Sequence, residues 1–192
     1  MGLLRSLAHP QRLLVQHAGL RIAVEVACLP PAVGHASWPR ARTISVADYV
    51  VMPPGGGERL AVRGSSLMFK AGADTTGGAF SLHERQIPAG GRRPPPHVHP
   101  DRAEAFWVLD GQAEFELDGD VVRAGAGSFV LVPGGVAHTF GAAADTAARV
   151  LVLHAPALDG YFRELAALWA GAEPPDRDAE LGLMRKHGMR PV

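Results

Sequence analysis

The chain has 192 residues, 47% of them apolar, and its 19 basic residues balance its 19 acidic ones. A length of this order suggests one domain, and the neutral balance argues against nucleic-acid binding, which shows as a basic excess. No apolar run approaches the roughly 18 residues that a membrane span needs, and the single cysteine excludes an intrachain disulfide. We therefore expect a cytoplasmic protein without nucleic-acid or membrane partners.

Residues 1–55 differ from the rest of the chain and are predicted to form an N-terminal extension. They are rich in arginine and interrupted by prolines, which break regular helices. Polar and charged residues also interrupt the apolar stretch that a secretory signal would need. Three interpretations remain open: a disordered tail, a basic transit-like segment, or a stretch upstream of the true start. We favour the last, because Met52 opens the part of the chain that has the pattern of a domain.

Residues 56–156 carry a β pattern and are predicted to form an all-β domain, either a sandwich or an antiparallel barrel. Alternating apolar residues run from Leu60 to Leu82, and later runs are separated by turn signals. Asp110-Gly111 and Asp118-Gly119 are typical of tight hairpins, and short strands at regular spacing indicate an all-β fold. The later strands are expected at 104–109, 112–117, 120–123, 128–132, 136–140 and 147–154.

The spacing of the apolar residues changes in residues 157–192, which are predicted to form a helical tail. Apolar residues recur at helical spacing over 158–169. A second short helix is expected over 176–187, because Gly188 follows it as a C-cap residue. The apolar stripe of the first helix would either pack on the barrel or form the interface of a homodimer.

Four potential metal ligands stand out in the β region. His97 and His99 are two residues apart and would share one face of a strand. Glu104 follows shortly, and His138 lies on a later predicted strand. Closure of a barrel would bring these side chains to one interior point. Three imidazoles and a carboxylate suit one divalent transition metal ion, which could be Fe, Mn, Ni, Cu or Zn.

Other polar residues of this region are not predicted to be metal ligands. His83 and His154 also fall on predicted strands, and we expect them to be core or rim histidines rather than ligands. Three arginines flank the first pair of histidines and would either lie in a solvated loop or meet an anionic substrate. They are Arg92, Arg93 and Arg102.

Glycines and prolines frame the four ligands in a pattern that resembles two motifs of the cupin family. Residues 91–111 resemble the first motif, Gly-x5-His-x-His-x4-Glu-x6-Gly, and residues 127–138 resemble the second, Gly-x5-Pro-x-Gly-x2-His. The family then expects an Asn where this chain has Ala142. Because that Asn is not a metal ligand, the departure concerns a local turn. The matching positions are Gly91, His97, His99, Glu104, Gly111, Gly127, Pro133, Gly135 and His138.

This resemblance implies a single cupin barrel of the jelly-roll type that holds one metal ion through these three histidines and Glu104. The proline run before His97 and the helical tail are also similar to small cupins related to quercetin 2,3-dioxygenase. We therefore expect a metal-dependent, dioxygenase-like oxidoreductase that acts on a small organic substrate of the enol or phenol type. Glu104 would ligate the metal or accept a substrate proton. Two alternatives stay open: a redox-silent isomerase, decarboxylase or lyase that uses the same metal, and a non-catalytic cupin that binds a small molecule.

Overall fold

The computed structural model describes residues 12–17, 20–25, 44–46 and 49–192. The chain divides into two compact units, Met1–Pro39 and Arg40–Val192. The first unit contains an antiparallel pair of strands, and the second contains another short antiparallel pair near its start. The other residues before 49 lie outside the described part of the chain, so the expectation that 1–55 is disordered or precedes the true start stays a prediction. The four strands are β1 (Arg12–His17), β2 (Leu20–Glu25), β3 (Ile44–Val46) and β4 (Tyr49–Val51).

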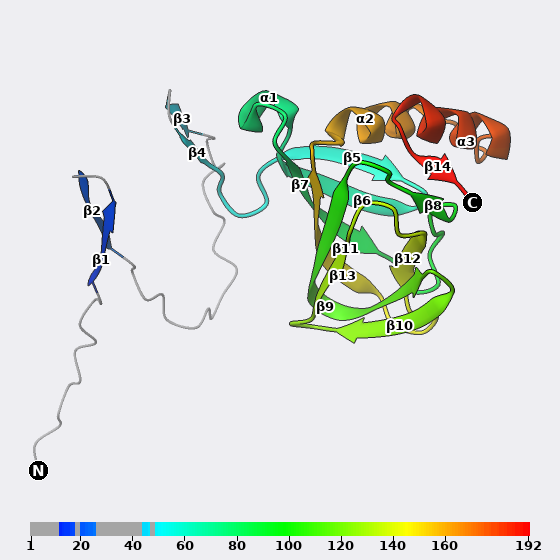
Figure 1. Ribbon diagram of the computed structural model, residues 1–192, viewed down its shortest axis with the longest axis horizontal. Helices are drawn as coiled ribbons and strands as arrows, with labels where there is room; N and C mark the ends of the chain where they lie inside the picture. The colour runs from blue at the N-terminus through cyan, green and yellow to red at the C-terminus, as the bar shows by residue number, and fades with distance from the viewer. Residues whose placement is uncertain (1–11, 18–19, 26–43, 47–48) are drawn as a thin grey trace, which may run out of the picture. The chain divides into compact units, whose positions relative to one another are not determined.

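The rest of the second unit is a ten-stranded sheet that curls into a barrel, with two helices along one side (Figure 1). All of its strand pairings are antiparallel, which confirms the predicted all-β class with C-terminal helices. Its elements are β5 (Glu58–Val62), β6 (Ser65–Ala71), α1 (Ala73–Thr76), β7 (Ser81–Ile87), β8 (His97–Val98), β9 (Ala103–Leu117), β10 (Asp120–Gly125), β11 (Phe129–Val132), β12 (His138–Ala142), β13 (Ala148–Ala155), α2 (Asp159–Leu168), α3 (Arg177–Lys186) and β14 (Arg190–Pro191).

The long strand β9 joins the two halves of the barrel. Up to Gly111 it pairs with β11 and β13, and beyond Gly111 it pairs with β10 and β12. The partner strand β13 skips Leu109, so β9 carries one extra residue and bends there. The hairpin predicted at Asp110-Gly111 is therefore wrong. Gly111 has a left-handed φ of 72° inside a continuous strand, where a Cβ would lie 1.9 Å from the Ala147 carbonyl oxygen.

Two other predicted turns are confirmed. Asp118 and Gly119 have positive φ values of 48° and 92° and connect β9 to β10 as a tight hairpin. The turn between β11 and β12 contains Gly135, with a φ of 93°. The Gly135 amide donates a hydrogen bond of 2.8 Å to the carbonyl oxygen of His99. This turn therefore holds the second motif against the first.

The two predicted C-terminal helices are also confirmed, as α2 and α3. The apolar stripe of α2 packs on the barrel, where Tyr161, Phe162 and Leu165 are buried against Leu67 and Phe69. The stripe is therefore covered within the chain, and the homodimer stays a prediction. After α3, strand β14 pairs with β8 and adds to the edge of the sheet. No helix in the described part of the chain is long and apolar enough to span a membrane.

The interior of the barrel has two chemically different parts. One part is apolar, and it contains three phenylalanines, Phe106, Phe115 and Phe140, whose rings pack against one another. The other part is polar. Strand β7, for example, buries His83 and Arg85 on its inner face. The candidate site lies in the polar part, between the phenylalanine cluster and the helices.

Candidate metal centre

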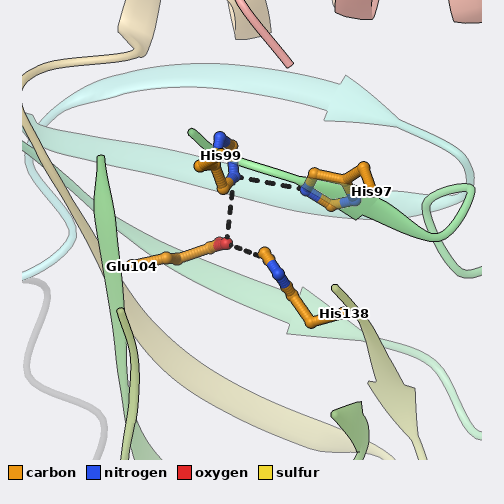
Figure 2. Close-up of side chains that lie close together, drawn as sticks. All are labelled: His97, His99, Glu104 and His138. Carbon is orange, nitrogen blue, oxygen red and sulfur yellow. Dashed lines mark hydrogen bonds and ion pairs between the residues drawn. The ribbon is translucent and has the colours of Figure 1, made fainter. Parts of the chain in front are cut away.

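The structure brings together all four predicted ligands in the polar part of the barrel. The side chains of His97, His99, Glu104 and His138 point toward one another from β8, β9, β12 and the residue after β8 (Figure 2). One ligand atom from each lies within 4.8 Å of the others, and all four residues are buried. The pairing of β8 with β12 places His97 directly opposite His138. This group could hold a metal ion.

The distances within the group fit the coordination shell of a transition metal. The Nε2 atoms of His97 and His99 are 3.2 Å apart. Glu104 Oε2 lies 3.4 Å from His99 Nε2 and 2.8 Å from His138 Nε2. Neighbouring ligands at right angles, each about 2.1 Å from an ion, are about 3 Å apart. Only small side-chain adjustments would therefore be needed to surround an ion.

Backbone carbonyls orient two of the imidazoles. His97 Nδ1 donates to the Pro95 carbonyl oxygen at 2.9 Å, and His138 Nδ1 donates to that of Val136 at 3.0 Å. With Nδ1 engaged in this way, Nε2 is the atom directed at the cluster. Burial, aided by the nearby His138, lowers the pKa of His97 to about 3, and burial also lowers the pKa of His99. Both are thus neutral, the form in which imidazole ligates a metal.

Glu104 is ionised despite its burial. Burial by itself raises the pKa of this carboxyl group, but the interaction with His154 and hydrogen bonds from three histidines hold the pKa well below its usual value. Burial lowers the pKa of His138, but the hydrogen bond to Glu104, the charge of Glu104 and smaller contributions from Val136 and Asp118 together outweigh it, so the net shift is upward. The contact of 2.8 Å between His138 Nε2 and Glu104 Oε2 is one that a metal ion bound to both residues would replace.

His154 is a further member of the site that sequence reasoning did not assign. It lies on β13 directly across from Glu104, is 1% exposed, and places Nε2 3.0 Å from Glu104 Oε1. Its ring stacks on that of His83 at 5.9 Å between centroids. His154 is thus buried, as expected, but its contact with Glu104 gives it a role in orienting a predicted ligand.

A small cavity of about 20 Å³ adjoins the cluster, enough for about one water molecule. His97, His99 and Glu104 line one side of it, and Arg63 and Arg85 also line it. Sequence reasoning considered other arginines for contact with a substrate, and none of those three is among the lining residues. They are Arg92, Arg93 and Arg102.

Comparison with known proteins supports the family suggested by the motifs. Residues 83–154 match the family model of the cupin domain. No curated protein matches the chain. Among solved structures, the chain is similar to a candidate ethanolamine utilization protein Q from Salmonella typhimurium LT2, with a TM-score of 0.50 and 18% sequence identity. The similarity covers 65% of this chain and 100% of that chain.

Two enzymes are also among the similar structures. The polyketide cyclase RemF from Streptomyces resistomycificus is 20% identical, with a TM-score of 0.48 over 55% of this chain and 78% of that chain. The nucleoside dehydratase Pac13, from Streptomyces, is 18% identical, with a TM-score of 0.46 over 58% of this chain and 86% of that chain. Similarity at this level concerns the fold and not the reaction. The match over residues 83–154 and the antiparallel barrel agree with the resemblance to the cupin family that the two motifs carry.

Proposed function

We propose that this protein is a metal-dependent enzyme that acts on a small organic molecule inside the barrel. The observation that carries the proposal is the buried group of three imidazoles and one carboxylate, with ligand atoms within 4.8 Å of one another. A divalent transition metal bound there would supply a Lewis acid with open coordination positions for a substrate oxygen.

The surrounding residues would exclude water and orient the carboxylate. Phe140, Leu158 and Phe162 line the cavity beside the cluster, so a bound substrate would be shielded from solvent and its polar contacts strengthened. His154 contacts Oε1 of Glu104, which leaves Oε2 facing His99 and His138. Glu104 is thereby kept in one orientation.

The finer proposal is a dioxygen-dependent oxidation of an enol or phenol. Glu104 would accept the substrate's hydroxyl proton. The three histidine contacts lower the pKa of Glu104 and make it a weak base, so it would take a proton more readily from a comparatively acidic group. An acidic hydroxyl, as in enols and phenols, suits such a base better than an alcohol does.

Dioxygen uptake tests this proposal. Protein loaded separately with Fe, Mn, Ni, Cu or Zn would be mixed with a panel of flavonols and small enols in an oxygen electrode, with anaerobic turnover followed in parallel. We expect uptake with at least one redox-active metal, and Glu104→Gln should slow it by about 10²-fold or more. The His187→Ala variant is the control, because His187 lies outside the cluster.

The two parts of the proposal fail separately. Absence of dioxygen uptake across the panel would contradict the dioxygenase assignment. Turnover that needs the metal but not dioxygen, with Zn as effective as Fe, would support redox-silent chemistry at the same site. Tight binding of a compound that is recovered unchanged, without turnover of any member of the panel, would contradict an enzymatic role.

A further inference from the structure

Arg85 is a buried cation on the wall of the same cavity. It lies on the inner face of β7, is 2% exposed, and lines the cavity together with His97, His99 and Glu104. Burial, and then the positive charge of Arg63, lower the pKa of Arg85 to about 9. The guanidinium therefore keeps its charge at neutral pH.

This cation has no carboxylate partner among the residues that the structure describes. Its contacts are one long hydrogen bond, from Nη2 to Ser65 Oγ at 3.3 Å, and the face of the Phe140 ring at 5.1 Å. Its Nε is buried without a hydrogen-bond partner in the described part of the chain. A buried charge left in this state is destabilising.

Arg63 lines the same cavity and provides a comparison, because it is a buried arginine that has partners within the chain. Its guanidinium pairs with the carboxylate of Glu180 on α3 and donates a hydrogen bond of 3.1 Å to the Tyr161 hydroxyl. Arg63 therefore has an ion-pair partner within the chain, whereas Arg85 has none among the described residues and is affected only by the more distant charge of Glu104 on the same cavity. Two buried arginines with such different partners point to different roles.

We propose that Arg85 binds a carboxylate group of the substrate, so that the substrate is a small carboxylic acid. The planar guanidinium edge matches the two oxygens of a carboxylate, and Ser65 Oγ lies beside it as a further polar contact. This inference rests on the proposed function, because it gives the substrate class for the cavity of the metal centre. One end of the substrate would meet Arg85 and its reacting oxygen would face the cluster.

The size of the cavity adds a condition. At about 20 Å³ it holds less than a carboxylic acid occupies. Leu158 and Phe162 line it from the α2 side, and Met189 lines it next to β14. The inference therefore implies that Leu158, Phe162 and Met189 move outward when the substrate enters.

Acetate is the probe, with acetamide as its uncharged control of similar shape. Binding to the metal-loaded protein would be measured by calorimetric titration. Acetate is expected to bind at least about tenfold more tightly than acetamide, a difference of about 1.4 kcal/mol. In Arg85→Met this preference should disappear, and Arg149→Gln, which changes an arginine exposed on the outer face of β13, should keep it. Equal binding of the two probes to the wild type, or unchanged acetate binding by Arg85→Met, would overturn the inference.

A stability measurement separates binding from a structural role. Because Arg85→Met removes a buried charge without a partner, its Tm without ligand should equal or exceed that of the wild type. A large drop in Tm would instead mean that Arg85 supports the fold. Should Arg85→Met fail to fold, Arg85→Lys keeps the charge but loses the planar fork, and it should bind acetate more weakly than the wild type.

Metal content keeps this inference distinguishable from the proposed function. Arg85→Met should retain the metal of the wild type, since Arg85 is not among the clustered ligands. A wild type without metal would contradict the proposed function, yet acetate binding would still report on Arg85. Loss of acetate binding in His97→Ala/His99→Ala, with full binding by Arg85→Met, would assign the carboxylate to the metal centre and overturn the role of Arg85.

Discussion

The two parts of the barrel interior have opposite effects on the stability of the fold. On one side, Phe106, Phe115 and Phe140 form an apolar cluster whose burial stabilises the fold. On the other side, imidazoles, a carboxylate and arginines are buried at the expense of stability. The phenylalanine cluster is therefore separate from the buried polar residues that line the cavity, apart from Phe140, which contributes to both. Real proteins commonly break packing rules at functional sites, and here the buried polar residues line a cavity together with Leu158, Tyr161 and Phe162 from the α2 side.

The largest effect is expected in the apolar part. Phe106→Ala should lower the free energy of unfolding by about 3–5 kcal/mol, because Phe106 is fully buried and its removal leaves a cavity. Urea denaturation would measure the loss. Phe129→Ala is the matched control, since Phe129 is 59% exposed and its loss should cost less than about 1 kcal/mol. Equal losses in the two variants would contradict the division of the interior.

The next largest loss of stability is expected when the buried ion pair between Arg63 and Glu180 is broken. Glu180→Gln should lower the free energy of unfolding by about 3 kcal/mol, because it leaves Arg63 buried without its counter-charge. Chemical denaturation of the metal-free protein is the appropriate measurement. The double variant Arg63→Met/Glu180→Met should recover most of this loss. A Glu180→Gln variant as stable as the wild type would show that Arg63 has no need of this partner.

The pH dependence of metal binding tests the polar part directly. The pKa of His138 is raised above its usual 6.5 by Glu104, although burial opposes the shift. Below that pKa a metal must displace the proton, so affinity should fall by about tenfold for each pH unit, and above it affinity should level off. Competition between the protein and a fluorescent chelator for Zn²⁺ would measure this. A flat profile across the same range would mean that His138 carries no competing proton.

The smallest effect is expected on the outer surface. Glu58 pairs with Arg163, and the two side chains are 42% and 43% exposed. Glu58→Gln should therefore lower the free energy of unfolding by less than about 1 kcal/mol, and the difference should shrink further at high salt. Denaturation at two salt concentrations would check both points. A loss as large as that of Glu180→Gln would remove the contrast between buried and exposed ion pairs.

Local signals were sufficient for the fold class and for the four clustered residues. The period of two, the turn dipeptides and the helical tail are visible in the sequence, and the two motifs contain all four potential ligands. The bend at Gly111 was predicted as a hairpin because a hairpin and a bulge both need a residue of positive φ. Only the pairing of β9 with four other strands distinguishes the two.

The other buried polar residues lacked a readable signal. Strand β7 has Leu82 on its outer face and His83 and Arg85 on its inner face, which reverses the usual rule that apolar residues face inward. In β13, Leu151 and Leu153 alternate with buried valines, so both faces are apolar and the inward direction of His154 cannot be seen. These positions depend on strand register, which the pattern along one strand does not specify.

Metal content is the most direct test of the central claim that the four buried residues form a metal centre. Elemental analysis would compare the wild type, His97→Ala/His99→Ala and the control His187→Ala, each shown to be folded. The account predicts about one transition metal ion per chain in the wild type and in the control, and none in the double variant. A folded wild type that neither contains nor takes up a metal ion, or a double variant that keeps it, would contradict the account.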